Sequence, residues 1–326
     1  MVLYSQFDHK LYSVHLATQD DNKLTHYQPP PMKVRFGIIA DIHKDVMHDA
    51  DSRLQSFIDH MIQEQVDFII QLGDFCVPKS ENWDFTQIWN QFQNPSYHVL
   101  GNHDTDGGFT RQQTIDYWGM DARFYSFDHK GVHFIVLDGN DVPVGHQSGY
   151  PCYIDGDQIA WLYEDLKQTD ACSIIFVHQS IELETDGSIK NGSEIRSLLE
   201  EVNRQAGFRK VIACFSGHHH RDYVRWINNI LYSQINSASY YWIGEEFLEV
   251  RYSQEIDRQY PWIKYTVPYQ DSIYGIVTLD LQKRTMELNG CKSEFVGSTP
   301  WELGKTRAYW DDRTLKPCVS SWKVFL

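Results

Sequence analysis

The stretch VRFGIIADIH, Val34 to His43, begins with a largely apolar run and ends on an aspartate and a histidine. The run VRFGIIA is typical of a buried β-strand, because it is short and rich in β-branched and aromatic residues. Asp41 and His43 stand directly after it, where the chain leaves the strand. The stretch therefore predicts a strand that carries candidate metal ligands at its carboxyl end.

Predicted strands and helices alternate along the chain after this point. Residues 51–65 are expected to form a helix, with Leu54, Ile58 and Ile62 on one face. Strands are predicted at 34–40, 67–72, 97–100, twice within 123–140, at 173–178 and at 211–215, and further helices at 84–93, 157–168 and 194–206. The stretches 223–242 and 273–288 are rich in β-forming residues. This order predicts an α/β fold whose sheet is covered by helices.

The segment QPPP before Met32 breaks regular structure, so residues 1–31 are expected to be an N-terminal arm. A main domain is expected over residues 32–290, with residues 291–326 as a C-terminal tail packed on it. No apolar run predicts a membrane span, and the first thirty residues do not resemble a signal peptide. The six cysteines form no CxxC pair and are expected to be free thiols. These features favour a cytoplasmic location.

The formal net charge of the chain is −15. Such a field repels nucleic acid, and no run of Lys and Arg offers a compensating basic patch, so a nucleic-acid partner is disfavoured. The same field opposes a small phosphorylated molecule unless something cationic lies in the binding site. The sequence leaves the oligomeric state open.

Five predicted strands end in Asp, Asn or His. The residues at these ends are Asp41 and His43, Asp74, Asn102 to Asp104, His178, and the triplet His218 to His220. A single histidine is more often a surface or core residue than a ligand, but the carboxyl ends of strands in an α/β sheet meet at one edge. A mixed set of Asp and His suits Zn²⁺, Mn²⁺ and Fe, whereas a structural zinc or iron–sulfur site would use Cys. The pattern predicts a metal site.

The triplet HHH, His218 to His220, lies deep inside the chain and is therefore not a terminal tag. It either holds a metal ion or solvates a turn. In an extended segment, His218 and His220 point to one side and His219 to the other. The outer two are therefore the expected ligands, and His219 is expected to face away from the metal or contact substrate. The glycines at 73, 101 and 217 stand where the chain turns sharply.

The ordered set resembles the motifs of the calcineurin-like metallophosphoesterases. The matching parts are DIH (41–43), GD (73–74), GNHD (101–104), His178 and GHHH (217–220). The resemblance implies a four-layered α/β/β/α sandwich, with two mixed sheets flanked by helices and a site for two metal ions. It implies Asp41, His43 and His220 on one ion, and Asn102, His178 and His218 on the other. It also implies that Asp74 bridges the two ions and that His103 contacts the phosphoryl group.

Two divalent or trivalent ions, manganese, iron or zinc, are the implied cofactors. They would provide a metal-bridging hydroxide as the nucleophile and reverse the local negative field. His103 would then stabilise the charge that develops on the phosphoryl group or protonate the leaving oxygen. Asp104 either orients His103 or accepts hydrogen bonds from local backbone N–H groups.

The segment GDFCVPK, from Gly73, departs from the GDxVDRG motif of protein Ser/Thr phosphatases, because the second Asp and the Arg are missing. The resemblance therefore favours the cyclic-nucleotide phosphodiesterase and small-molecule branch. The expected function is a phosphodiesterase or phosphatase that acts on small phosphorylated molecules such as nucleotides. The alternatives are a nuclease or protein phosphatase with the same metal site, or a non-catalytic scaffold that retains the fold.

Two segments are candidates to line the substrate pocket, the loop 141–155 and the aromatic-rich stretch 240–269. Aromatic faces at this density could stack a nucleobase, although most such residues belong to a core or a dimer surface. The expected substrate contacts are His219, Tyr240 and Tyr241.

Overall fold

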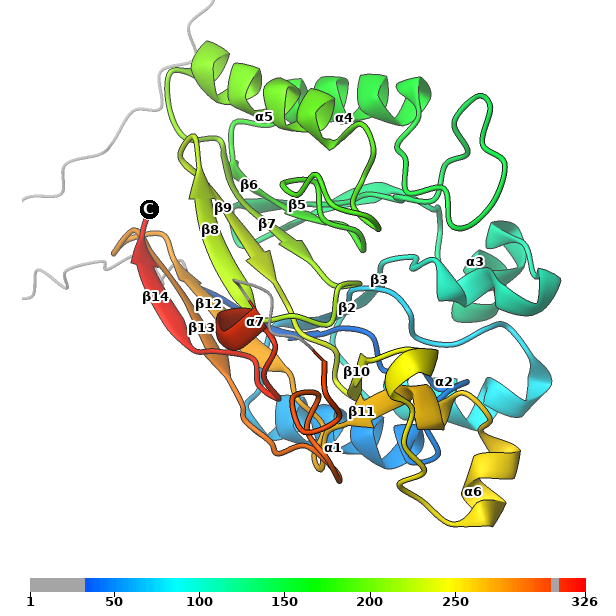
Figure 1. Cartoon of the computed structure of the whole chain (residues 1–326). Coiled ribbons are helices and arrows are strands. Elements are labelled where there is room, and N and C mark those ends of the chain that lie inside the picture. Colours follow the sequence, from blue (N-terminus) through cyan, green and yellow to red (C-terminus); the bar gives the residue numbers. More distant parts are fainter. Residues whose placement is uncertain (1–32, 306–310) are drawn as a thin grey trace, which may run out of the picture. The chain divides into compact units, whose positions relative to one another are not determined.

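The computed structural model describes residues 33–305 and 311–326. The N-terminal arm expected at residues 1–31 lies outside the described residues. From Lys33 onward, the described chain forms two six-stranded sheets that carry helices on their outer faces (Figure 1). This arrangement confirms the predicted four-layered α/β/β/α sandwich.

The first sheet has the strand order β14-β13-β12-β1-β2-β3. Its strands are β1 (Lys33–Ile39), β2 (Phe68–Gln71), β3 (Ser96–His98), β12 (Gly275–Asp280), β13 (Thr285–Gly290) and β14 (Trp322–Phe325). β1, β2 and β3 are parallel to one another, whereas β12, β13 and β14 join as antiparallel neighbours. The sheet is therefore mixed, and its parallel half places the ends of β1, β2 and β3 at the same edge.

The second sheet has the strand order β4-β5-β6-β7-β9-β8. Its strands are β4 (Tyr125–His129), β5 (Val132–Val136), β6 (Cys172–Phe176), β7 (Val211–Ser216), β8 (Tyr223–Ile227) and β9 (Ile230–Gln234). β5, β6, β7 and β9 pair in parallel through the centre, and β4 and β8 are antiparallel edge strands. β6 and β7, which precede two groups of candidate ligands, lie side by side.

Phenylalanine side chains hold the two sheets face to face. The rings of Phe36 and Phe68 in the first sheet pack against Phe134 in the second at centroid distances of 5.9 and 5.0 Å. Phe36 also contacts Phe176 and Phe215. Burying such rings contributes about 1.5–3 kcal/mol each, so this core fixes how the two sheets meet.

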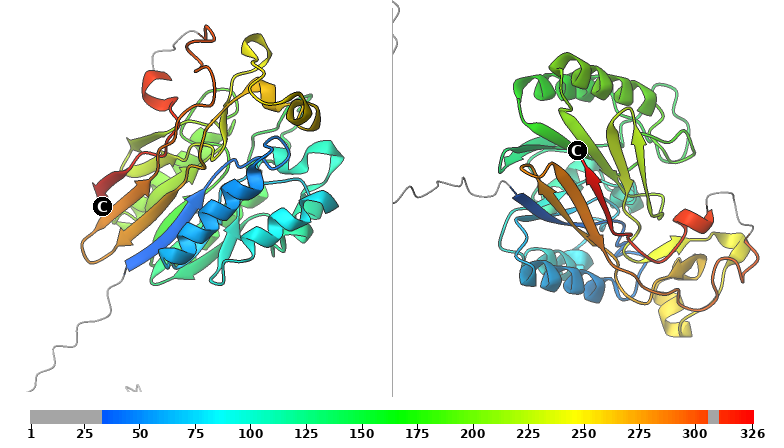
Figure 2. Two further views of the ribbon diagram at one scale, coloured as in Figure 1. Left: turned by 90° about the horizontal axis from the view of Figure 1, so that it is seen from below. Right: turned by 90° about the vertical axis from the view of Figure 1, so that its left-hand side faces the viewer.

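Helices cover the outer face of each sheet, as the right-hand view of Figure 2 shows in blue and green. The first sheet carries α1 (Ala50–Gln63) and α2 (Trp83–Trp89), and the second carries α4 (Gly156–Gln168) and α5 (Gly192–Ala206). α1 buries Leu54, Phe57, Ile58 and Met61 on the sheet side. Ile62, which the sequence analysis placed on the same face, is 47% exposed, because the buried face turns by the helical period toward Met61.

Several short elements were not predicted from the sequence. They are α3 (Arg111–Trp118), α6 (Gln254–Gln259), β11 (Thr266–Pro268) and α7 (Asp311–Thr314), whereas β10 (Tyr240–Trp242) lies within the β-rich stretch 223–242. A local signal for α3 exists, because Thr110 and Gln113 form a capping box and Gly119 ends the helix in the left-handed region. β10 and β11 form a separate two-stranded sheet beside the edge where β1 and β2 end.

Within the expected C-terminal tail, β14 pairs with β13 and so extends the first sheet. Its side chains alternate between half-buried and exposed, the pattern of an edge strand with one face on the core. Among the described residues, no helix has the length and apolar content that crossing a bilayer requires.

Candidate metal centre

The candidate ligands come from the carboxyl ends of strands in both sheets. Asp41 and His43 follow β1, Asp74 follows β2, and Asn102 follows β3. His178 follows β6, and the triplet 218–220 follows β7. We expected these ends at one sheet edge. The structure instead divides them between two facing sheets, and the apolar core between the sheets brings the two sets of strand ends together.

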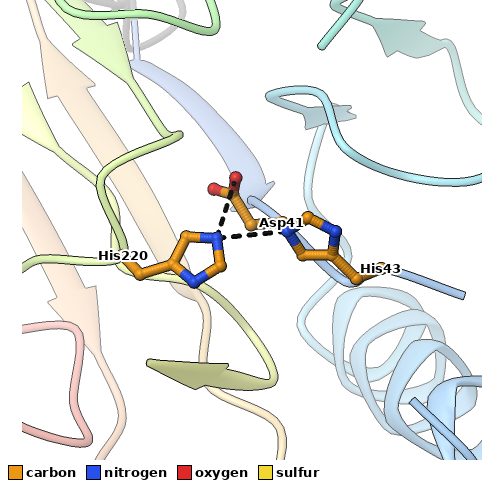
Figure 3. Close-up of side chains that lie close together, drawn as sticks. All are labelled: Asp41, His43 and His220. Atoms are coloured by element: carbon orange, nitrogen blue, oxygen red, sulfur yellow. Dashed lines mark hydrogen bonds and ion pairs between the residues drawn. The ribbon is translucent and has the colours of Figure 1, made fainter. Parts of the chain in front are cut away.

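The first group of ligand atoms comes from Asp41, His43 and His220, which are all buried. Their candidate ligand atoms lie within 4.8 Å of one another. Nε2 of His220 lies 3.4 Å from Oδ1 of Asp41 and 3.1 Å from Nε2 of His43 (Figure 3). A carboxylate and two imidazoles thus point at a common centre, which is the donor set that Zn²⁺, Mn²⁺ or Fe prefers.

The second group comes from Asp74, His178 and His218, and its ligand atoms also lie within 4.8 Å of one another. Nε2 of His178 lies 3.2 Å from both Oδ2 of Asp74 and Nδ1 of His218. It also lies 3.0 Å from Oδ1 of Asn102. Oδ2 of Asp74 reaches the first group as well, at 3.7 Å from Nε2 of His43. Asp74 therefore lies between the two groups.

The hydrogen bonds around His178 test whether a cation fits this arrangement. Nδ1 of His178 lies 2.7 Å from the carbonyl oxygen of Leu72, so in the neutral ring Nδ1 donates and Nε2 carries a lone pair. That lone pair faces the acceptor oxygens of Asp74 and Asn102. Acceptor atoms converge in this way only around a proton or a cation. Nδ2 of Asn102 and Nδ1 of His220 are buried without a hydrogen-bond partner among the described residues. A cation fits the donor set.

The backbone at the site adopts a rare conformation. Asp41, His43, Asp74, His218 and His220 all have positive φ angles, between 50° and 74°. This left-handed region costs roughly 1–3 kcal/mol for a residue other than glycine, and such strain clusters at functional sites. The triplet is therefore not extended. His218 and His220 serve different groups, and His219 turns away from both.

Two glycines make room for ligands that come from other loops. A Cβ atom on Gly217 would lie 2.5 Å from Oδ2 of Asp41. A Cβ atom on Gly101 would collide with the backbone and carboxylate of Asp74. Neither glycine has positive φ, so close approach rather than turn conformation is the reason for glycine at these two positions.

Burial and neighbouring charges set the protonation of the imidazoles. Burial holds the pKa of His43 well below its usual value, and burial together with the neighbouring His178 does the same for His218. Burial by itself would lower the pKa of His178, but the Asp74 and Asp41 carboxylates outweigh it and raise the pKa to about 9. A ligating imidazole must be neutral, so His178 loses its proton when it serves as a ligand.

His103 lies beside the two groups with its ring directed by Asp106. Nδ1 of His103 lies 2.6 Å from Oδ2 of Asp106, and the hydroxyl of Tyr150 lies 3.0 Å from both Nδ1 of His103 and Oδ1 of Asp106. Burial favours the neutral imidazole, but the carboxylates of Asp74 and Asp106 outweigh it and raise the pKa of His103 to about 9. The carboxylate fixes Nδ1 and leaves Nε2 available to a substrate.

Of the two roles considered for Asp104, the structure shows the local one. Its buried carboxylate accepts hydrogen bonds from four backbone N–H groups, those of Asp74, Phe75, Cys76 and Gly101, at 2.7–3.1 Å. These bonds tie the loops after β2 and β3 together. Asp106, rather than Asp104, is the hydrogen-bond partner of the His103 ring.

The expected substrate contacts occupy three different positions. His219 is half-buried, and its Nε2 lies 3.1 Å from the hydroxyl of Ser180 and 3.3 Å from that of Ser188. Tyr240 is buried, with its ring 4.9 Å from those of His43 and His220. Tyr241 is also buried and hydrogen-bonds with Lys305. All three line one cavity of about 810 Å³, which is also lined by four of the candidate ligands, His43, Asp74, His218 and His220.

Tyr150 lies in the loop 141–155 and Trp242 and Trp262 lie in the stretch 240–269, and the two segments were both expected to line the pocket, although these three residues were not singled out as contacts. Asp106 also lines the cavity and was not predicted as a site residue. Asp106 stands three residues after His103, and that spacing was an available signal for a hydrogen-bonded pair. Trp242 and Trp262 are 43% and 54% exposed, unlike the two tyrosines before Trp242. No local signal distinguishes them, because exposure depends on the packing of β10 against the rest of the fold.

Comparison with known proteins identifies the family. The sequence model of the calcineurin-like phosphoesterases matches residues 34–222 of the 326 residues, and the chain belongs to this family. No curated protein sequence matched the chain. The structure is similar to that of a dimetal phosphatase from Danio rerio, with a TM-score of 0.58 and 15% identity over 82% of this chain and 100% of that one.

It is also similar to GAP50, described as the anchor in the inner membrane complex of Plasmodium. That comparison has a TM-score of 0.53 and 16% identity over 88% of this chain and 89% of that one. Both likenesses concern the fold. The family is that of metallophosphoesterases, and it implies a site for two divalent metal ions.

Proposed function

We propose that the protein is a metal-dependent hydrolase of phosphate esters, a phosphodiesterase or phosphatase that acts on small phosphorylated molecules such as nucleotides. The position of Asp74 is the observation that carries this proposal. Its Oδ2 lies 3.7 Å from Nε2 of His43 in one ligand group and 3.2 Å from Nε2 of His178 in the other. A carboxylate shared between two groups is what a dinuclear site requires.

The proposed ligands of one ion are Asp41, His43 and His220, those of the other are Asn102, His178 and His218, and Asp74 is shared. Two cations bound there would supply the nucleophile at neutral pH and would neutralise charge on the phosphoryl group. The ligand set holds only two carboxylates, Asp41 and Asp74, so a surplus of positive charge is left for a phosphate. This surplus opposes the chain's net charge of −15.

His103 has a separate proposed role. Its ring centroid lies 5.3 Å from that of His43, so it borders the first ligand group without belonging to it. Asp106 holds Nδ1, and the free Nε2 can donate a hydrogen bond to a phosphoryl oxygen or a proton to the leaving oxygen. Tyr150 supports the same carboxylate from the opposite loop.

The cavity favours a small molecule over a macromolecule. Its volume of about 810 Å³ lies within the range of roughly 300–1,000 Å³ that is typical of small-molecule pockets. A bare phosphate ion would fill only a small part of it. Duplex nucleic acid is disfavoured by the charge of the chain, because binding would need compensating cations along an extended surface.

The experiment that tests the proposal combines metal content and turnover. Purified protein is loaded with Mn²⁺, its bound metal is measured by elemental analysis, and hydrolysis of bis-p-nitrophenyl phosphate is followed. We expect metal-dependent release of p-nitrophenol, which Asp74→Asn lowers by about 10²-fold or more together with its metal content. Asp84→Asn, an exposed position on α2, serves as the matched control and should change neither quantity.

The alternatives predict different outcomes. A scaffold that retains the fold would show no turnover with Mn²⁺, Fe²⁺ or Zn²⁺ on any phosphate ester, and that result would refute the proposal. A nuclease or protein phosphatase on the same site would turn over oligonucleotides or phosphoproteins faster than nucleotides at equal concentration.

A further inference from the structure

A second cavity meets the first one beside the ligand groups. The first cavity, of about 810 Å³, extends from the ligands to Trp242 and Trp262, and we name it the aromatic arm. The second, of about 520 Å³, is lined by the segments 148–152 and 185–190, and we name it the polar arm. Tyr150 and His218 line both cavities. The two arms therefore meet where a phosphoryl group would bind.

The two arms are built by different parts of the fold. Trp242 ends β10, and Trp262 lies in the segment between α6 and β11. The polar arm is built instead by the loop between β5 and α4 and the loop between β6 and α5. Figure 1 shows β10, β11 and α6 beside the ends of the first sheet, and α4 and α5 on the far side of the second sheet. A group bound in one arm does not compete for space with a group in the other.

The aromatic arm presents exposed indole rings. Trp242 and Trp262 are 43% and 54% exposed, and their ring centroids are 6.5 Å apart with an interplanar angle of 43°. Tyr265 packs against both rings, with centroid distances of 6.0 Å to Trp242 and 5.7 Å to Trp262. Exposed indole faces beside a polar site suit a planar aromatic group, which gains stacking contacts and covers apolar surface.

The polar arm has a different chemistry. It is lined by the hydroxyl-bearing Ser148, Thr185 and Ser188 and by one charge of each sign, Asp186 and Lys190. Opposite charges and hydroxyl groups suit a neutral group that both donates and accepts hydrogen bonds, such as a sugar or glycerol. Gly187 brings this arm into close contact with a candidate ligand, because a Cβ atom there would lie 2.6 Å from Nε2 of His218.

We infer that the substrate is an acyclic phosphodiester with a planar aromatic group, as in a nucleoside, on one ester oxygen and a hydroxylated group on the other. This inference rests on the proposed phosphoesterase function and specifies its substrate class. A monoester has one substituent and leaves one arm empty. A cyclic diester carries both ester oxygens on one compact ring and reaches only one arm.

Four substrates test the inference with the Mn²⁺-loaded full-length protein. They are adenosine 5′-phosphoglycerol, its analogue without the base (ribose 5-phosphoglycerol), its analogue with methyl in place of glycerol, and AMP. Hydrolysis is followed by chromatography. We expect the full diester to have the highest kcat/KM, and loss of the base to lower kcat/KM by about 5- to 100-fold, the contribution of one stacked base. AMP should be a poorer substrate than either adenosine diester.

Variants assign each effect to an arm. Trp262→Ala should lower kcat/KM for both adenosine diesters and leave the base-free diester within about twofold. Thr185→Trp, which fills the polar arm from an exposed position, should lower kcat/KM for the glycerol diester but not for the methyl diester. The controls are Trp226→Ala, an exposed tryptophan on β8, and Glu184→Trp, an exposed neighbour that does not line the arm.

Several results would overturn the inference. These are AMP hydrolysed as fast as the glycerol diester, a base-free diester hydrolysed as well as the adenosine one, or a Trp262→Ala variant that affects all four substrates equally. Hydrolysis of bis-p-nitrophenyl phosphate by the same preparation distinguishes a wrong substrate class from a wrong proposed function. If that reporter is turned over and the adenosine diesters are not, the substrate class is wrong and the phosphoesterase function stands.

Discussion

Oδ2 of Asp106 lies 2.6 Å from Nδ1 of His103, three residues earlier in the chain. This contact gives the imidazole a fixed orientation at the border of the first ligand group. Tyr150, from a loop that follows β5, places its hydroxyl 3.0 Å from the other carboxylate oxygen. The pair and its support therefore join two loops that are far apart in the sequence, and all three residues line the cavity.

Asp106→Asn should lower kcat by about 10- to 100-fold, because an amide holds the imidazole less firmly and does not stabilise its protonated form. Metal content should stay at the wild-type value, since Asp106 belongs to neither ligand group. Steady-state kinetics and elemental analysis check the two parts. Asp104→Asn provides a contrast, because each oxygen of Asp104 accepts from two backbone N–H groups and the amide keeps only one of these oxygens, so two N–H groups lose their acceptor and the melting temperature should fall. A loss of bound metal in Asp106→Asn would place Asp106 among the ligands.

Gly217→Ala should weaken metal binding at the first ligand group by about 10- to 100-fold, because the added Cβ atom displaces the carboxylate of Asp41. The affinity for Mn²⁺ is measured by isothermal titration calorimetry. Gly156→Ala is the matched control, since a Cβ atom there meets no neighbour within 4 Å. Unchanged affinity in Gly217→Ala would show that Asp41 can move without loss of binding.

His219→Ala should leave the metal content near the wild-type value, whereas His218→Ala should lose about one equivalent. The reason is that Nε2 of His219 faces the hydroxyls of Ser180 and Ser188, while Nδ1 of His218 faces His178. Elemental analysis after dialysis against metal-free buffer distinguishes the two variants. Equal losses in both would mean that the triplet rearranges when metal binds.

His133 on β5 should make the stability of the protein depend on pH. Nδ1 and Nε2 of His133 each lie 2.8 Å from a carboxylate, that of Asp128 and that of Asp165. Burial opposes the charged ring, but these two carboxylates outweigh it and raise the pKa of His133 above 6.5. A raised pKa in the folded state contributes stability below the usual pKa, and this contribution is lost as pH rises through the folded value.

We therefore expect His133→Gln to lower the free energy of unfolding by about 1–2 kcal/mol near pH 6 and by less near pH 9. Urea unfolding of wild type and variant at several pH values measures the difference. His146→Gln, in the loop before α4, is the control and should show no such trend. A difference that grows with pH would contradict the assignment of a protonated ring.

Local sequence predicted most elements of the sandwich. The apolar run after Met32 became β1, and the amphipathic periodicity at Leu54 and Ile58 became α1, because burial of one face is a local property of the chain. β14 was not predicted, since a short edge strand half-exposed on one face carries little apolar signal. α3 was missed although its capping residues were present.

The sequence by itself determined which residue types stand at the ends of the strands, and their order was enough to indicate a family. Only the tertiary structure decided that β1 to β3 and β6 and β7 belong to different sheets, that Tyr150 supports the His103–Asp106 pair, and which aromatic rings stay exposed beside the cavity. The reason is physical. The pattern of apolar residues along a strand depends on its own neighbours, whereas the partners of Asp74 and Trp242 come from other segments of the chain, which the packing of the two sheets brings together.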